Sequence, residues 1–210
     1  MAHAPARVPP VLLGGAMRVI RPRDAARVYA HARPEVARLA RAGALHRLTS
    51  GYYAVVPDDR VGRHWLPELE PAAVGIAVAD EGVDTVAAMG LSAARLHGAI
   101  PRALGVAIVA TGRHRSPLRF GDRAATALYV RRKVSTLDVE RRSDELGTYW
   151  VTTVEQTVLD LAARPGLGDL PDEATAAARA LLPRADQDIL KELATAQRRQ
   201  APLRRLLAED

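Results

Sequence analysis

The sequence predicts an α+β fold in two parts, and three observations support this division. Within the first 68 residues, two short helical segments are followed by two strands. The rest of the chain mixes helical and strand-like segments and ends in helices. Eight of the 210 residues are aromatic and 40 are alanine, so we expect modest cores of Leu, Val and Ala.

Two short helices are expected in the first part. Pro22 suits the first position of a helix that extends to about Ala30, because its fixed φ matches the helix and its missing N–H needs no partner there. Pro34 suits the first position of a second helix in the same way. His31 lies in the tight joint between them, and Gly43 is suited to end the second helix.

A β-hairpin is expected directly after these helices. Residues 45–48 and 52–56 have the composition of strands, and the polar turn between them contains Gly51, which tolerates a positive φ. Two helices, a tight joint and a β-ribbon within about 40 residues indicate a winged helix-turn-helix. We place this domain at residues 1–68, with the linker somewhere in residues 60–71.

Residues 69–210 are expected to form an α+β domain with a helical tail. Its first helix is expected at residues 91–97, and strands are expected at residues 106–110, 118–120 and 127–134 and up to Val151. Thr152 and Thr153 each begin a capping box, with Glu155 and Gln156, and predict a helix there. Three further helices are expected at residues 172–182, 186–197 and 202–208.

The composition excludes several classes of function. The chain has no cysteine, which excludes disulfide scaffolds, thiolate metal sites and cysteine nucleophiles and suits a reducing compartment. Its longest uncharged runs have ten residues, about half of what a membrane span needs. The N-terminus lacks a signal-peptide pattern. We therefore expect a soluble cytoplasmic protein with no membrane partner.

The positive charge is concentrated in two stretches. Residues 1–68 contain 11 Arg and five acidic residues, which accounts for the whole net charge of +6, because residues 69–210 contain 19 basic and 19 acidic residues. Residues 95–142 contain 11 basic and three acidic residues. Two separate basic stretches indicate a polyanionic partner.

Double-stranded DNA is the partner that this charge and the hairpin favour. Arginine can read guanine, and Arg, Ser and Tyr can bind phosphates. The candidate DNA-binding residues are Arg23, Arg33, Arg38, Arg41, Arg47, Ser50 and Tyr52. A possible second basic surface consists of Arg131, Arg132, Lys133, Arg141 and Arg142.

The sequence contains no convincing catalytic constellation, and we expect no enzyme activity, cofactor or metal. The six histidines are scattered without a paired spacing. Asp138 and Glu140 provide the paired carboxylates that a nuclease would need, but we expect them to pair with neighbouring arginines. The two alternatives are a ligand-responsive repressor with an apolar pocket in its second domain and, less favoured, a DNA nuclease.

Three segments of the chain resemble the AbiEi-type antitoxin family. Residues 39–53, LARAGALHRLTSGYY, resemble its helix-then-wing signature. Residues 91–98, LSAARLHG, resemble its SAA..LHG segment, and residues 151–162, VTTVEQTVLDLA, resemble its VTTPERTLLDLA segment. The three segments follow one another in the order expected for the family.

The resemblance implies a two-domain antitoxin that represses its own operon. It implies that the N-terminal winged helix binds inverted repeats in promoter DNA. It also implies that the C-terminal domain neutralises a nucleotidyltransferase-type toxin encoded beside it, with or without direct contact between the two proteins. Asp160 matches the family pattern, and we expect it to be a partly buried acid that needs a hydrogen-bond donor.

Overall fold

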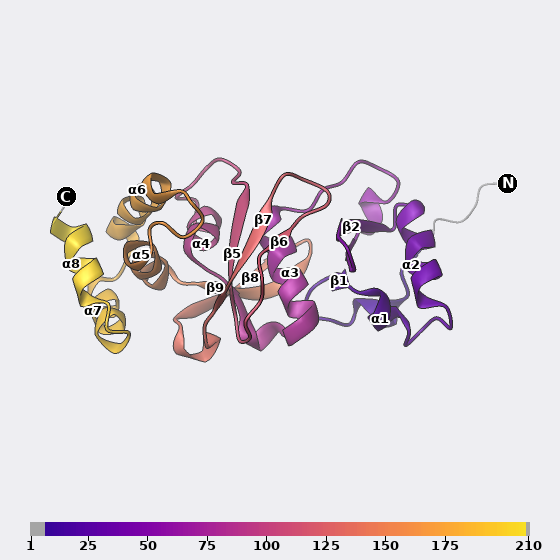
Figure 1. Cartoon of the computed structure of the whole chain (residues 1–210), viewed down its shortest axis with the longest axis horizontal. Coiled ribbons are helices and arrows are strands. Elements are labelled where there is room, and N and C mark those ends of the chain that lie inside the picture. Colours follow the sequence, from indigo (N-terminus) through magenta and orange to yellow (C-terminus); the bar gives the residue numbers. More distant parts are fainter. Residues whose placement is uncertain (1–6, 209–210) are drawn as a thin grey trace.

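The computed structural model describes residues 7–208. Among these residues the chain forms eight α-helices and two β-sheets, which confirms the mixed α+β composition. Figure 1 shows the small sheet with α1 and α2 at one end, the larger sheet in the middle, and helices α5–α8 at the other end. We call residues 7–68 the first module and residues 69–208 the second module.

The first module is a three-stranded antiparallel sheet with two helices. Its strand order is β1-β3-β2, and β2 and β3 form the expected hairpin, with Gly51 at φ +82° in the turn. The elements are the 3₁₀ helix Pro10–Leu13, β1 (Val19–Ile20), α1 (Pro22–Ala25), α2 (Ala32–Arg41), β2 (Leu45–Thr49) and β3 (Tyr52–Val55).

Both helices of the first module have bounds different from those expected. Pro22 begins α1 as expected, but the helix ends at Ala25 because the chain turns into tighter 3₁₀-type hydrogen bonds there. Helix α2 begins two residues before Pro34, which is tolerated because the N–H groups of the first turn have no partner inside the helix. Gly43 ends α2 as expected, at φ +73°.

The second module is built on a six-stranded sheet of order β6-β7-β5-β4-β9-β8. Strands β5 and β7, and β4 and β9, run parallel, and the other neighbouring pairs are antiparallel. The strands are β4 (Val86–Ala88), β5 (Val106–Thr111), β6 (Leu118–Arg119), β7 (Thr126–Arg131), β8 (Val139–Asp144) and β9 (Gly147–Thr152). The sequence analysis did not expect β4 or β8.

Helices cover both faces of this sheet. On one face lies α3 (Leu69–Glu81), which was not expected, packed against Ala107 and Val109 of β5. On the other face, Val106 and Ile108 of the same strand pack in a core formed with the remaining helices. These helices are α4 (Gly90–Leu96), α5 (Val154–Ala163), α6 (Pro171–Leu181), α7 (Gln187–Ala196) and α8 (Gln200–Ala208).

Only half of one expected capping box forms at the start of α5, because the N–H of Thr153 donates to the carbonyl of Asp138 and not to the side chain of Gln156. Thr153 is the N-cap, and its hydroxyl accepts a hydrogen bond from the N–H of Gln156. The box expected at Thr152 is wrong because Thr152 is still the last residue of β9. Its hydroxyl is 2.8 Å from that of Thr157 instead.

The two modules share a hydrophobic core. Val19, Leu48 and Ala54 of the small sheet pack in one cluster with α3 and with Phe120. The contact between β1 and α3 depends on Gly75, since a Cβ at this position would lie 2.4 Å from Cγ2 of Val19. The first module is therefore held against the second by the face of its sheet opposite α1 and α2.

Candidate functional site

A groove of about 860 Å³ lies in the first module between the beginnings of α1 and α2 and the β2–β3 turn. Most of its polar lining is basic. We call it the arginine groove and define it by the side chains of Arg21, Arg23, Arg33, Arg47, Ser50, Tyr52 and Asp80, which all line it.

The arginine groove brings together five of the seven candidate DNA-binding residues. Arg23, Arg33, Arg47, Ser50 and Tyr52 come from four segments of the chain and converge on it. The other two do not line it and lie further along α2. Arg38 is exposed and pairs with Glu35 at 2.9 Å, and Arg41 is exposed in the last turn.

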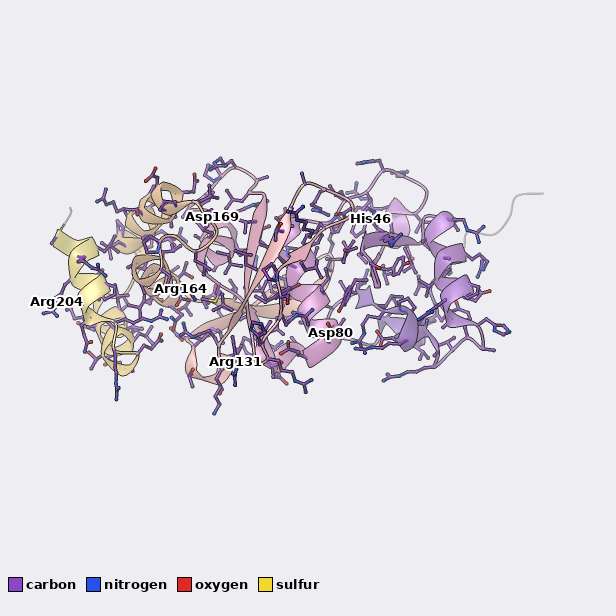
Figure 2. The ribbon with its side chains drawn as sticks, in the orientation of Figure 1. His46, Asp80, Arg131, Arg164, Asp169 and Arg204 are labelled. Carbon is purple, nitrogen blue, oxygen red and sulfur yellow. The ribbon has the colours of Figure 1, made fainter. Side chains whose placement is uncertain are left out.

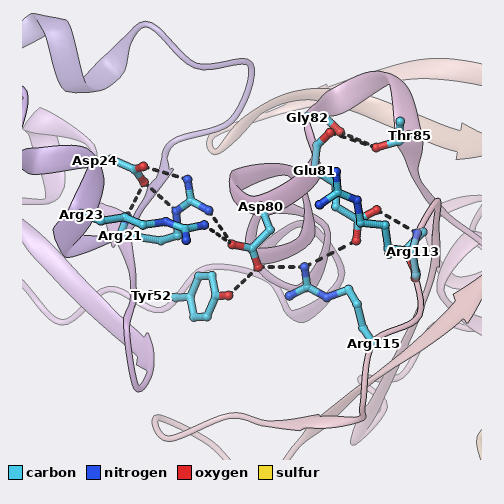
Figure 3. Close-up of polar contacts among 11 residues, drawn as sticks. Arg21, Arg23, Asp24, Tyr52, Asp80, Glu81, Gly82, Thr85, Arg113 and Arg115 are labelled. Atoms are coloured by element: carbon cyan, nitrogen blue, oxygen red, sulfur yellow. Dashed lines mark hydrogen bonds and ion pairs between the residues drawn. The ribbon is translucent and has the colours of Figure 1, made fainter.

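Asp80, at the C-terminal end of α3, accepts hydrogen bonds from four side chains in and beside the groove (Figure 3). Its Oδ1 accepts hydrogen bonds from Arg21 at 2.5 Å and Arg23 at 3.1 Å. Its Oδ2 accepts from the hydroxyl of Tyr52 at 2.5 Å and from Arg115 at 2.8 Å. One carboxylate of the second module thus holds two arginines and one tyrosine of the first.

The hydrogen bond to Asp80 limits what Tyr52 can do. The hydroxyl proton is directed at Asp80, so the phenol oxygen can accept but is not free to donate to a phosphate. Burial and the neighbouring carboxylate of Asp80 both raise the pKa of Tyr52, which keeps the proton in place. We therefore assign Tyr52 to the architecture of the groove.

Arg21 is fixed more firmly than the other arginines of the groove. Its side chain donates to both carboxylate oxygens of Asp24, while Asp24 also accepts from the backbone N–H of Arg21. The carboxylate of Asp24, in the first turn of α1, thereby satisfies the backbone N–H of the N-cap residue Arg21. The hydrogen bond to Asp24 raises the pKa of Arg21 despite partial burial.

The uncompensated charge of the groove lies at Arg33 and Arg47. Arg21, Arg23 and Arg115 are close to three acids, Asp24, Asp80 and Glu81, so this cluster is nearly neutral. Arg33 and Arg47 are exposed, and within residues 7–208 neither forms an ion pair. An anion that enters the groove would meet these two guanidinium groups first.

Arg21, Asp80 and Arg115 are not among the site residues expected from the sequence. Asp80 is 59 residues from Arg21 and 35 from Arg115, so no local spacing connects them. The helix that carries Asp80 also gave no signal, because its first nine residues are buried on all sides and lack a polar stripe.

The five residues of the expected second basic surface do not form one surface. Arg131 and Lys133 are exposed at the end of β7, and Figure 2 labels Arg131. Arg141 and Arg142 lie on β8, and three strands separate β8 from β7, which corresponds to roughly 19 Å at the usual strand spacing. Arg141 lies over the ring of Trp150, at 3.8 Å from its centroid.

Arg132, the fifth residue, turns inward to Asp160. Asp160 is buried, and its Oδ1 lies 2.6 Å from Arg199 and 3.6 Å from Arg132 and accepts a hydrogen bond from Gln156. This confirms that Asp160 is an acid with donors around it. Burial raises the pKa of Asp160, and the two guanidinium groups oppose that shift. Burial also lowers the pKa of Arg132.

The basic stretch at residues 95–142 is largely neutralised in space. Five of its arginines pair with acids from outside the stretch, so segregation of charge along the sequence does not become segregation on the surface. The pairs are Arg95 with Glu70, Arg102 with Glu173, Arg115 with Asp80, Arg132 with Asp160 and Arg141 with Asp84.

The two carboxylates considered for a nuclease, Asp138 and Glu140, have different partners in the structure. Asp138 accepts a hydrogen bond from Thr153 at 2.8 Å, and Glu140 lies 3.9 Å from His97. The expectation that both pair with neighbouring arginines is therefore wrong.

Residues 7–208 contain no group of three or more His, Cys, Asp or Glu side chains that could hold a metal ion. No helix in the same range is long and apolar enough to cross a membrane.

Comparisons with known proteins establish the fold alone. No family model matches the chain, and no curated protein matches it. Among solved structures, the crystal structure of the RV2827C protein from Mycobacterium tuberculosis matches with a TM-score of 0.54 and 16% identity. The match covers 84% of this chain and 66% of the other, so this chain spans just under two thirds of that protein's length.

Proposed function

We propose that this protein is a DNA-binding antitoxin that represses its own operon and neutralises a nucleotidyltransferase-type toxin. The observation that carries the DNA-binding part is the arginine groove between the start of α2 and the β2–β3 turn. Two helices and a β-hairpin in this order also support a winged helix-turn-helix for the first module.

In this proposal α2 is the helix that enters the major groove and the hairpin is the wing. Two exposed arginines of α2 outside the arginine groove, Arg38 and Arg41, would face base edges, where a bidentate contact to guanine is the commonest specific one. Arg33 of α2 and Arg47 of β2, which both line the arginine groove, would contact phosphates, and exposed Ser50 at the turn would add a neutral hydrogen bond.

The antitoxin part rests on the resemblance of residues 39–53, 91–98 and 151–162 to AbiEi-type antitoxins. In the structure, residues 91–98 lie in and just after α4, and residues 151–162 span the end of β9 and α5. Both segments contribute to the core of the second module, around Leu91 and Leu159. The resemblance therefore concerns residues that build the fold of the second module, and this supports the proposal that the second module is the antitoxin domain.

Binding of the chain's own promoter DNA tests the DNA-binding part. Full-length protein should shift promoter DNA, with an affinity that falls steeply with salt because phosphate contacts release counterions. Arg33→Ala with Arg47→Ala should weaken binding and reduce the salt slope by about 1.8. The matched control is Arg204→Ala with Arg205→Ala, which removes the same charge from α8 at the far end of the molecule from the first module (Figure 1). Full-length protein that shifts no promoter DNA at low salt would refute the proposal.

A ligand-responsive repressor stays the second candidate because of a groove of about 350 Å³ among α5, α6 and α8. Its size is within the range of small-molecule sites, and Leu161, Ala178 and Leu206 make part of it apolar. Growth rescue separates the two candidates. When the toxin encoded beside it is expressed constitutively, an antitoxin still protects the cells. A ligand-responsive repressor does not protect them, because it acts only on transcription.

A further inference from the structure

A loop of the second module lies along the hairpin of the first. Residues 113–119 comprise most of the connection from β5 to β6 and β6 itself, and they are linked to the hairpin at two places, once through Asp80 and once directly. Arg115 binds the same carboxylate of Asp80 that Tyr52 binds, at 2.8 Å. Four residues further on, the hydroxyl of Thr49 donates a hydrogen bond of 3.0 Å to the carbonyl of Arg119. Figure 3 shows Arg113 and Arg115 beside Asp80, which lines the arginine groove, and the bond to Thr49 places Arg119 at the hairpin.

Contacts within the second module also fix this segment. The N–H of Arg113 donates to Glu81 at 3.1 Å, and its carbonyl accepts from the hydroxyl of Thr111 at 2.9 Å. The guanidinium of Arg115 lies 4.6 Å from the centroid of the Tyr129 ring. A segment with these contacts presents its exposed side chains in defined positions, even though most of it is neither helix nor strand.

The exposed charges of the segment are all positive. Residues 112–119 contain three arginines and no acid. The charge of Arg115 is balanced by Asp80 and Glu81. Arg113 and Arg119 are exposed, and in the described part of the chain neither guanidinium forms an ion pair. They add two uncompensated charges on the second-module side of the hairpin, beside those of Arg33 and Arg47 in the groove.

We propose that Arg113 and Arg119 contact the DNA backbone, so that the nucleic-acid interface extends from the first module onto the second. This inference rests on the proposed DNA binding and adds residues that the sequence analysis did not include. Phosphate is the group these side chains suit, because both guanidinium groups are exposed and a guanidinium can bind a phosphate with two parallel hydrogen bonds. The hairpin would then contact DNA with basic residues on both of its sides.

The test compares two double variants of the full-length protein on its own promoter DNA over a range of salt. Arg113→Ala with Arg119→Ala should lower affinity roughly tenfold or more at 0.1 M salt and reduce the salt slope by about 1.8. Arg204→Ala with Arg205→Ala removes the same charge from α8, which lies at the far end of the molecule, and should change neither affinity nor slope (Figure 1). The thermal unfolding of both should match wild type, because the segment is anchored by Arg115 and by backbone groups.

Replacement by lysine separates phosphate contact from other roles. Arg113→Lys with Arg119→Lys should restore most of the salt slope, since a phosphate accepts a point charge. Wild-type affinity and slope in the alanine variant would overturn the inference while leaving the proposed function intact. Normal DNA binding combined with lost growth rescue would also overturn it and assign the segment to a protein partner. Failure of wild-type protein to bind any DNA would instead refute the proposed function itself.

Discussion

The hydroxyl of Tyr52 in the hairpin donates a hydrogen bond of 2.5 Å to Asp80 at the end of α3. This bond joins the expected wing to the central helix of the second module. Because Asp80 also binds Arg21 and Arg23, the same carboxylate sets the position of α1 relative to the hairpin. The shape of the arginine groove therefore depends on a residue outside the first module.

We expect Asp80→Asn to destabilise the protein. The substitution keeps the size of the side chain but removes the charge that Arg21, Arg23 and Arg115 share, and Asp80 is only 20% exposed. The free energy of unfolding should fall by about 2 kcal/mol, a typical value for hydrogen bonds to a charged group. Urea unfolding followed by circular dichroism measures it. Asp59→Asn, at a carboxylate that is 77% exposed, is the control and should change stability by less than about 0.5 kcal/mol.

Gly75→Ala should also destabilise the protein, although replacing glycine in a helix interior usually stabilises by about 1 kcal/mol. The new Cβ would lie 2.4 Å from Cγ2 of Val19, and the β-branched valine has little freedom to move away. We expect a net loss of about 1–3 kcal/mol.

Shortening the neighbouring side chain checks the reason for this loss. Val19→Ala alone should destabilise because Val19 is buried in the shared core. In the Gly75→Ala background, however, the same change should cost less or restore stability. A double-mutant cycle in urea with no coupling between the two positions would show that β1 does not press on α3 as the structure has it.

Acid should weaken the contact between the modules at Asp122. Burial would raise the pKa of Asp122, but hydrogen bonds from Arg123 and from His46 of the first module outweigh burial and lower it below the ordinary 3.8. A lowered folded-state pKa gives stability that is present above the unfolded value and is lost as pH falls through the folded value. Asp122→Asn should therefore be less stable than wild type at pH 6, and the difference should shrink between pH 4 and pH 2. A difference that stays constant over this range would show that the carboxylate is not linked to folding.

The sequence predicted the elements that carry a local signal. Gly43 and Gly51 were identified because their turns require positive φ, and the structure confirms both. The hairpin and the tail helices were identified from alternation and from apolar stripes. Such signals are contained within a few residues, so one sequence is enough to detect them.

The elements that were missed lack those signals for physical reasons. Helix α3 is buried nearly all round over residues 69–77, so it has no polar face to mark the helical period. Strand β8 is an edge strand whose exposed Arg141 and Arg142 were interpreted as a surface. Helix α3 was missed because it is buried nearly all round, and β8 because it is exposed along almost its whole length, so neither shows the alternation of buried and exposed positions that marks an element.

The candidate site was predicted in part for the same reason. Arg33 and Arg47 were selected by charge and by their place in a recognisable unit, and they meet in the groove. Asp80 and the segment at residues 113–119 come from the second module and reach the groove only because the two modules share a core. Long-range contacts of this kind have no counterpart in local spacing.

The last prediction concerns the two arginines of α2 that lie outside the groove. Arg38→Ala and Arg41→Ala should each weaken promoter binding without unfolding the protein, because both side chains are exposed, and the buried contacts of the helix come from Val36 and Leu39. If either reads a guanine, its loss should cost about 1–3 kcal/mol of binding free energy and relax specificity at one base pair. If either contacts phosphate, affinity for all sequences should fall together, with a salt slope reduced by about 0.9.

Arg38 is the more informative of the two because Glu35 already holds it at 2.9 Å. Glu35→Gln should release the guanidinium and remove a negative charge from the DNA-facing side of α2. We therefore expect Glu35→Gln to strengthen binding to promoter DNA and to unrelated DNA alike, whereas Arg38→Ala should act in the opposite direction. Binding to a set of promoter variants with single base-pair changes, measured at two salt concentrations, distinguishes these outcomes. Wild-type affinity in Arg38→Ala, Arg41→Ala and Glu35→Gln would show that α2 does not face the DNA.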